Sequence, residues 1–295
     1  MEEENQKYLW KYLSLDKFNS LLNNKSLYLP SLKRLQLSMD PIEGATSKCL
    51  LNSAIKQMEK SSNGILSIKN WDNLDRTFKK LYKESLNSYK KFVDAPIIYS
   101  FIYSMTYSER ENYSLWHIYP TDLRGRVQIN QGLSLKMDEE HFKTLFVNKN
   151  ISIQNNNLNL DIAMPSLENV IYKTKQEINE LINSDKIPNQ NEFHEFLHNI
   201  SLIKNDFYDF AKEKRYIVEL EYDIDAIIHS DYKSDTSFIK VSFDIKKFFN
   251  PDFCKIIISP FATETLKDYV KFLLEKQNIK YTDDIVCDSE IAIPN

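Results

Sequence analysis

Two stretches of the sequence decide the fold: residues 98–106, which read IYSFIYSMT, and residues 210–218, which read FAKEKRYIV. Each places polar residues beside an apolar run. Residues 95–107 are apolar nearly throughout, which predicts a strand buried on both faces. The second stretch predicts a strand over residues 215–222, with Glu213 just before it. We expect these two strands to form two walls of one site.

The overall composition predicts a globular chain with a substantial core. The chain has 295 residues, of which 42% are hydrophobic and 13% aromatic, enough for a single domain over residues 1–295. The 38 basic and 42 acidic residues give a net charge of -4, so no basic excess points to nucleic acid. Three widely spaced cysteines, no signal peptide and no long apolar run predict a cytoplasmic protein outside the membrane.

Glycine is scarce, and its scarcity excludes the common phosphate-binding loops. Only four glycines occur in the chain, and their spacing permits neither a G-x-G-x-x-G turn nor a P-loop. A nucleotide bound by this chain therefore needs a different kind of site.

The periodicity of apolar residues predicts a mixed α+β fold. Strands are expected at residues 8–12, 26–29, 95–107, 124–129, 151–162, 215–222, 237–243 and 255–259. Helices are expected at residues 14–24, 46–60, 71–91, 165–182, 188–212 and 263–276. Residues 279–293 are expected to form a short strand and a tail. We interpret residues 165–212 as a helical insertion into a small mixed-sheet core.

The order of short motifs along the chain resembles the bacterial domain-of-unknown-function family 2971. An aromatic-basic-Tyr opening is followed by a strand ending near proline, an Asp-Pro-x-Glu element and a strand ending in Ser-x-Thr. A Trp-x-x-Tyr pair, a glycine, a Phe-x-x-Glu-x-Arg block and an Ile-rich strand before Ser-Pro come next. The matching residues are Trp10, Lys11, Tyr12, Pro30, Asp40, Pro41, Glu43, Ser104, Thr106, Trp116, Tyr119, Gly125, Phe210, Glu213, Arg215, Ser259 and Pro260.

The same order of motifs is similar to that of the ADP-ribosyltransferases. These proteins lack a glycine-rich loop and hold NAD in a cleft between two small sheets. The resemblance implies NAD as substrate, an acceptor as second partner, and a toxin or defence role with a regulatory or immunity protein. It assigns catalytic roles to Lys11, Ser104 and Glu213. It assigns nucleotide contacts to Tyr12, Thr106, Trp116, Tyr119 and Arg215.

The residue types suit this chemistry. Cleavage of the nicotinamide–ribose bond creates an oxocarbenium-like centre, which a carboxylate such as Glu213 can stabilise. The Ser104 hydroxyl can orient the ribose or the carboxylate, and an aromatic ring can stack on a base. Lys11, Arg215 or Arg126 can hold phosphate. Lys11 stands where transferases carry His or Arg, and an ammonium lacks the planar fork of a guanidinium.

Structural explanations compete with each of these assignments. Trp116 and Tyr119 have helical spacing and can belong to the core. Ser104 can bond within a sheet, and Glu213 with Arg215 can form an ordinary ion pair on an exposed strand edge. A chain that keeps the cleft without turnover would be a non-catalytic nucleotide-binding module.

A second motif predicts different chemistry. His194, Glu195 and His198 form an H-E-x-x-H sequence, which on a helix places two imidazoles on one face for a zinc-dependent hydrolase. Its surroundings are polar and rich in Asn, and the third ligand would have to be Glu213, Glu219 or Glu221. We therefore expect no bound metal and keep the hydrolase as an alternative.

Overall fold

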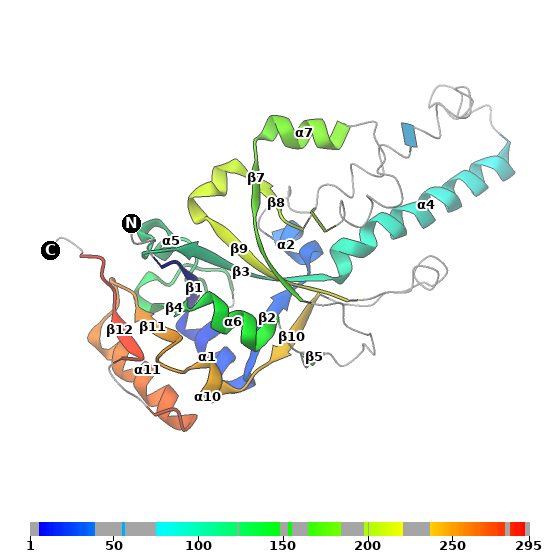
Figure 1. Ribbon diagram of the computed structural model, residues 1–295. Helices are drawn as coiled ribbons and strands as arrows, with labels where there is room; N and C mark the ends of the chain where they lie inside the picture. The colour runs from blue at the N-terminus through cyan, green and yellow to red at the C-terminus, as the bar shows by residue number, and fades with distance from the viewer. Residues whose placement is uncertain are drawn as a thin grey trace.

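The computed structural model describes residues 6–38, 55–56, 75–122, 124–147, 153–154, 165–183, 198–199, 201–220, 237–280 and 284–292. These residues form a mixed α+β structure built on a large sheet, with helices packed around it (Figure 1). The α+β class expected from the sequence is confirmed. Among the described residues, no helix combines the length and the apolar character that crossing a membrane requires.

The large sheet has seven strands in the order β12-β11-β4-β1-β3-β9-β6. Neighbouring strands are antiparallel except β11 and β12, which are parallel. The strands are β1 (Tyr8–Ser14), β3 (Ser100–Ser108), β4 (Gly132–Met137), β6 (Ser166–Asn169), β9 (Glu213–Glu219), β11 (Cys254–Ile258) and β12 (Val286–Asp288).

Two smaller sheets complete the strand content of the described residues. The first has three antiparallel strands, β2 (Ser26–Pro30), β10 (Phe238–Ser242) and β5 (Ile153–Gln154), in the order β2-β10-β5. The second pairs β7 (Ile171–Lys173) in parallel with β8 (Ile203–Asn205). The predicted strand at residues 151–162 falls mostly outside the described residues.

The N-terminal unit β1-α1-β2 follows the sequence closely. Ser14 ends β1 and caps α1 (Leu15–Asn24), and its side-chain oxygen accepts a 3.4 Å bond from the Lys17 backbone N–H, as expected of an N-cap serine. Phe18, Leu21 and Leu22 turn one face of α1 into the core. The helix and both strands expected here are confirmed.

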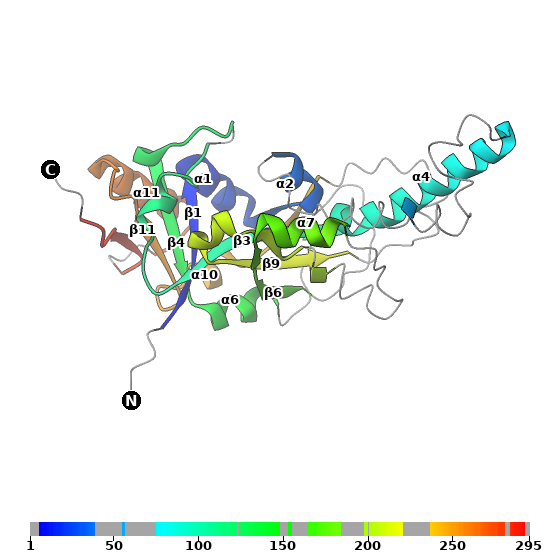
Figure 2. The same ribbon diagram turned by 90° about the horizontal axis from the view of Figure 1, so that it is seen from above.

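The remaining helices lie around the sheets. They are α2 (Leu32–Ser38), α4 (Arg76–Tyr99), α5 (Tyr113–Trp116), α6 (Glu139–Phe146), α7 (Lys175–Asn183), α10 (Ile245–Phe248) and α11 (Glu264–Lys276), with 3-10 turns η2 (Ile129–Gln131) and η3 (Asp206–Ala211). Figures 1 and 2 agree that α4 extends away from the sheets. Leu81 on α4 is 56% exposed, so this leucine of the helix does not belong to the core.

Two sequence expectations are corrected here by the fold. Residues 95–99 end helix α4, so the strand begins at Ser100. The strand expected at residues 124–129 is a turn around Gly125, because the Asp122 carboxylate accepts the backbone N–H groups of Arg124 and Arg126. Such side-chain bonds compete with strand pairing. The strand lies instead at β4, between β1 and β11 at the centre of the sheet.

The region interpreted as a helical insertion is the largest correction. Within residues 165–212 the structure contains β6, β7 and β8 as well as α7 and η3. β6 joins the large sheet by pairing with β9. The polar sequence suggested solvated helices, but short edge strands that face solvent are equally polar. The expected helix at residues 46–60 lies outside the described residues except at 55–56.

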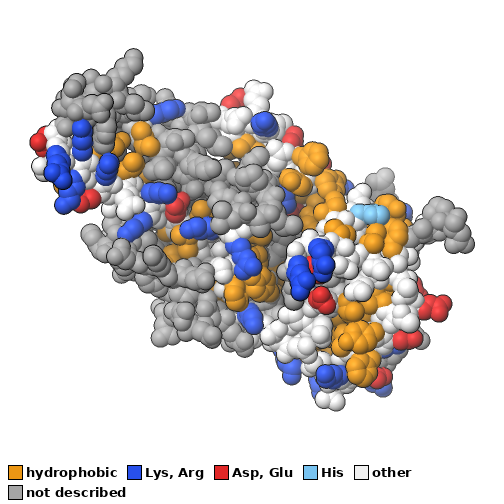
Figure 3. Space-filling model, turned by 180° about the vertical axis from the view of Figure 1, so that it is seen from behind, with side chains coloured by type: hydrophobic (Ala, Val, Ile, Leu, Met, Phe, Trp, Pro, Cys, Tyr) orange, Lys and Arg blue, Asp and Glu red, His pale blue; other side chains and the backbone are white. Residues whose placement is uncertain are grey.

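Buried side chains of the described residues include two groups around the large sheet. The larger joins the sheet to α1, α6, α10 and α11 and includes Leu9, Phe142 and Val270. The smaller contains Trp10, Tyr12, Leu115, Trp116, Ala211 and Ile257. Hydrophobic side chains also reach the surface, and they gather in patches beside Lys and Arg side chains on the face shown in Figure 3.

Candidate functional site

The candidate site lies along one edge of strand β3. On this edge the two ends of β3 have different partners, one in each of two sheets. At its C-terminal end β3 pairs with β1, but this pairing covers only Tyr8 to Trp10 of β1. At its N-terminal end Phe101 forms a bridge with Ser31, which follows β2. The other edge of β3 pairs with β9 without interruption from Ser100 to Thr106. The two sheets therefore part along the middle of β3, at Tyr103 to Met105.

Lys11 occupies this gap. Its ammonium donates a 2.6 Å hydrogen bond to the Ser104 backbone carbonyl and lies 4.3 Å from the centre of the Tyr103 ring. The side chain as a whole keeps some exposure. Burial of the ammonium, together with the positive charge of Lys17, lowers the pKa of Lys11 to about 8. A strand carbonyl that β1 no longer reaches is thus satisfied by a lysine side chain.

Glu213 opens strand β9 and is held by two cations. One carboxylate oxygen accepts a 2.8 Å bond from Lys204 and the other a 2.7 Å bond from Arg215. Burial would raise the pKa of Glu213, but Arg215, Lys204 and the hydrogen bond from Ser104 outweigh it and hold the pKa well below its usual range. The carboxylate is therefore ionised at every physiological pH.

The Glu213 carboxylate is buried from solvent. Glu213 is 6% exposed and Arg215 is 0% exposed, so the alternative of an ordinary pair on an exposed strand edge is wrong. The Arg215 guanidinium also donates to the Ser201 carbonyl, and the Glu213 backbone N–H donates a 2.7 Å bond to the Tyr172 hydroxyl. The ammonium of Lys204 lies 4.9 Å from the Tyr208 ring centre.

The three residues assigned catalytic roles are brought together from three segments. Ser104 contacts both of the others, through its carbonyl to Lys11 and through its side chain to Glu213. The register pairs Ser104 with Arg215 and Thr106 with Glu213, so these four residues share one face of the sheet. Glu213 is buried, while Ser104 and Lys11 are partly exposed, so a ligand would reach the site from their side.

The predicted aromatic contacts lie elsewhere. The Tyr12 and Trp116 rings meet edge to face, 4.9 Å apart, and are 4% and 0% exposed. The Tyr12 hydroxyl accepts a 2.9 Å bond from the Asn112 backbone, and Trp116 donates to the Glu111 carboxylate. Tyr119 packs against this same buried group. The rings anchor α5 to the sheet, and Tyr12 and Trp116 present no exposed face for a ligand.

Four residues near the site were missed by the sequence reasoning: Lys17, Tyr172, Lys204 and Tyr208. Three of them lie in the region interpreted as a helical insertion, where a helix would scatter them around its axis. In the structure the β7–β8 pair and η3 place them beside Glu213. Short strands of mixed polarity give little periodic signal. Arg126, the other basic candidate, forms an ion pair with Asp122 and is 66% exposed.

The H-E-x-x-H motif is only partly within the described residues. His194 and Glu195 lie outside them. His198 is described, and its Nδ1 atom lies 3.1 Å from a Glu219 carboxylate oxygen. This contact raises the pKa of His198. Among the described residues, no group of three or more His, Cys, Asp and Glu side chains could hold a metal ion. Glu213 is already held by Lys204 and Arg215.

The charges of the site are unequal. Lys204 and Arg215 bind the single carboxylate of Glu213, and the charge of that carboxylate also acts on Lys11. The carboxylate that acts on Lys17 is that of Asp122. An anion can stabilise such an excess of positive charge. The ionised Glu213 can in turn stabilise a developing cation, but its low pKa makes it unsuited to proton transfer near neutral pH.

No protein-family model, curated protein or solved structure matches the chain. The family membership suggested by the motif order therefore stays a prediction.

Proposed function

We propose that this chain binds NAD at the parting of the two sheets and either transfers its ADP-ribose group to an acceptor or cleaves NAD. The observation that carries the proposal is the meeting of Lys11, Ser104 and Glu213 at this one place. These residues come from three segments about a hundred residues apart. Lys11 supplies a positive charge, Ser104 a hydroxyl, and Glu213 a carboxylate that two cations hold in place. That arrangement is similar to the one used by ADP-ribosyltransferases.

In the proposed reaction Glu213 acts through its charge. Each carboxylate oxygen has two lone pairs, so each retains acceptor capacity beside its bond to Lys204 or Arg215. A ribose hydroxyl can take up that capacity. The negative charge then stabilises the oxocarbenium-like centre that forms as the nicotinamide–ribose bond breaks. Fixing Glu213 between two cations keeps it oriented before the reaction, which is how preorganised electrostatic groups act.

The other residues position the substrate. In the proposal the Ser104 side chain, which helps to lower the pKa of Glu213, orients this carboxylate. Tyr172 and Tyr208 are partly exposed rings next to Glu213 and Lys204, and either can stack on a base or on nicotinamide. These rings replace Tyr12 and Trp116 in that role, because the latter are buried in protein.

The experiment that tests the proposal is release of nicotinamide from NAD, with and without a bacterial extract as a source of acceptor. We expect release by the unaltered protein and a loss of at least about 100-fold in Ser104→Ala and Glu213→Gln. Glu139→Gln is the matched control, because Glu139 also binds a β9 lysine but on the opposite face of the sheet. Equal release by Glu213→Gln would show that the wrong residue is assigned.

A non-catalytic nucleotide-binding module is the second candidate. The observation that favours it is the engagement of both Glu213 oxygens by cations. Calorimetric titration with NAD separates the two candidates. Binding without nicotinamide release under any condition favours the module, whereas an absence of both binding and release contradicts both proposals.

A further inference from the structure

Helix α4 concentrates positive charge in a chain that is acidic overall. Its residues Arg76–Tyr99 include six basic and two acidic side chains, a local net charge of +4, whereas the whole chain carries -4. The basic residues are Arg76, Lys79, Lys80, Lys83, Lys90 and Lys91. The helix extends away from the sheets in Figures 1 and 2, and Lys and Arg side chains gather over its projecting end in Figure 3.

The six basic residues share one side of α4. At about 100° per residue they fall within an arc of about 120°, and the row from Arg76 to Lys91 is about 22 Å long. Three of its members are exposed: Lys80, Lys83 and Lys90. Two acids lie near the row. Glu84 lies 3.8 Å from Lys80, and both side chains are mostly exposed, while Asp94 follows near the end of the helix. The row therefore keeps an excess of positive charge.

The apolar residues of α4 lie on its other sides and are mostly covered. Tyr82, Leu86 and Tyr89 are half-buried, whereas Leu81 is 56% exposed. A helix that lies on a membrane buries a free apolar face in the lipid beside its basic face. Since most of the described apolar side chains of α4 are covered by protein, the helix offers a partner its charge rather than an apolar face.

We propose that the basic side of α4 binds the phosphate backbone of a double-stranded nucleic acid. A duplex carries one negative charge per about 1.7 Å of its axis, so a straight row of cations about 22 Å long can contact several phosphates at once. Lys and Arg clustered along a helix are the electrostatic pattern of a nucleic-acid contact. This pattern depends on where the charges lie, which the net charge of the chain does not report.

The composition of the row favours a duplex over a single strand. Proteins that bind single strands combine positive charge with aromatic rings on which unpaired bases stack. Within the helix as the structure describes it, no residue on the basic arc is aromatic. Contacts to the backbone alone are the kind that a paired duplex offers.

Fluorescence anisotropy at low salt tests the surface with labelled duplexes of DNA and of RNA and with a single strand of the same sequence. The variant replaces three exposed lysines together, Lys80→Gln, Lys83→Gln and Lys90→Gln, since glutamine keeps the helix propensity. We expect duplex binding to weaken at least about 10-fold and its dependence on salt to become shallower, because fewer phosphates are neutralised. Replacing the same lysines by arginine should retain the binding.

The matched control removes three exposed lysines from α10 and α11, as Lys246→Gln, Lys247→Gln and Lys276→Gln. It changes the net charge equally, so we expect duplex binding to stay close to that of the unaltered protein. Equal weakening in both triple variants would mean that only net charge matters and would reject the surface. Unchanged binding in the α4 variant, with a melting temperature showing that it folds, also overturns the proposal.

The remaining outcomes identify the partner. Binding of either duplex, of DNA or of RNA, supports the proposal, and a preference between them names the nucleic acid. Tighter binding of the single strand overturns the duplex assignment. Binding to vesicles rich in phosphatidylserine, without binding to a duplex, overturns it in favour of a membrane surface. Duplex binding without nicotinamide release from NAD keeps this surface and rejects NAD cleavage, because the two proposals rest on different residues.

Discussion

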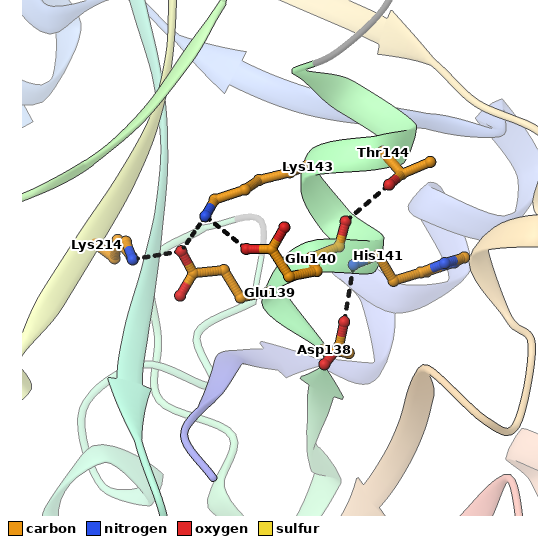
Figure 4. A network of polar contacts seen from close by, with 7 residues as sticks. All are labelled: Asp138, Glu139, Glu140, His141, Lys143, Thr144 and Lys214. Carbon is orange, nitrogen blue, oxygen red and sulfur yellow. Dashed lines mark hydrogen bonds and ion pairs between the residues drawn. The ribbon is translucent and has the colours of Figure 1, made fainter.

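Strand β9 carries two ion networks on its opposite faces, and they differ in charge balance. On one face Lys214 binds Glu139 at 2.6 Å, and Lys143 bridges Glu139 and Glu140 (Figure 4). Two carboxylates there meet two ammonium groups. On the other face the single carboxylate of Glu213 meets Lys204 and Arg215 directly, with Lys11 nearby. The first network is neutral and the second is strongly positive.

The networks also differ in exposure and in what holds them. Glu140 and Lys143 have side chains 79% and 31% exposed, whereas Glu213 and Arg215 are 5% and 0% exposed. Glu139 and Glu140 lie in the first turn of α6, where the helix dipole favours acids. The network of Lys214, Glu139, Lys143 and Glu140, called the outer network below, therefore needs no role beyond stabilising the fold. A buried, unbalanced group of charges is costly to fold, and such groups mark candidate functional sites.

The largest expected effect on stability is that of Glu213→Gln. Glutamine leaves Lys204 and Arg215 buried without their anion, so the free energy of unfolding should fall by about 3–5 kcal/mol. Glu139→Gln should cost less, because the Glu139 side chain is 14% exposed and one of its two partners, Lys143, is 31% exposed. Urea unfolding of both variants measures the difference. Equal losses would contradict the distinction between the two networks.

The pH dependence of stability should report Lys11. Its pKa is about 8 in the folded protein and near 10.5 when unfolded. Between these values the unfolded chain binds more protons, so the contribution of this group to stability rises with pH, by up to about 3 kcal/mol. Below pH 8 the buried charge is a constant penalty.

The check on Lys11 is a comparison with Lys11→Met. The free energy of unfolding of the unaltered protein should rise from pH 7 to pH 10 relative to this variant, which keeps the apolar stem. Parallel profiles would show that the ammonium is fully hydrated in the folded protein.

A smaller effect is expected from the outer network. Lys143→Ala removes a partly exposed ammonium from Glu139 and Glu140, and exposed pairs contribute about 1 kcal/mol or less. The loss should shrink further in high salt, and nicotinamide release should be unchanged. Thermal melting at low and high ionic strength provides the measurement. A loss above about 2 kcal/mol would place this network among the buried ones.

The smallest expected effect concerns metal. Glu219, at the far end of β9, binds His198 of the H-E-x-x-H motif. We expect protein purified without added metal to contain zinc well below one atom per chain, and chelation to leave the melting temperature unchanged. Near-stoichiometric zinc that is lost in His194→Ala would instead favour the hydrolase alternative.

Local patterns in the sequence were enough to predict much of the N- and C-terminal structure. Apolar alternation indicated β1 and β2, and the Ser14 cap with Phe18, Leu21 and Leu22 indicated α1. The strand β11 and helix α11 were predicted in the same way. Each of these elements buries one apolar face, so its apolar residues recur at the spacing of a helix or a strand.

The sequence by itself also placed Lys11 and Ser104 on two strands and Glu213 just before a third. Only the tertiary structure decided that these strands are neighbours, that β1 leaves β3 after Trp10, and that Lys204 and Arg215 enclose Glu213. Strand order and the partners of a buried charge depend on contacts between residues distant in the chain. The local periodicity of a sequence does not report such contacts. For this reason β4, β6 and β8, the strand that contains Lys204, were not predicted.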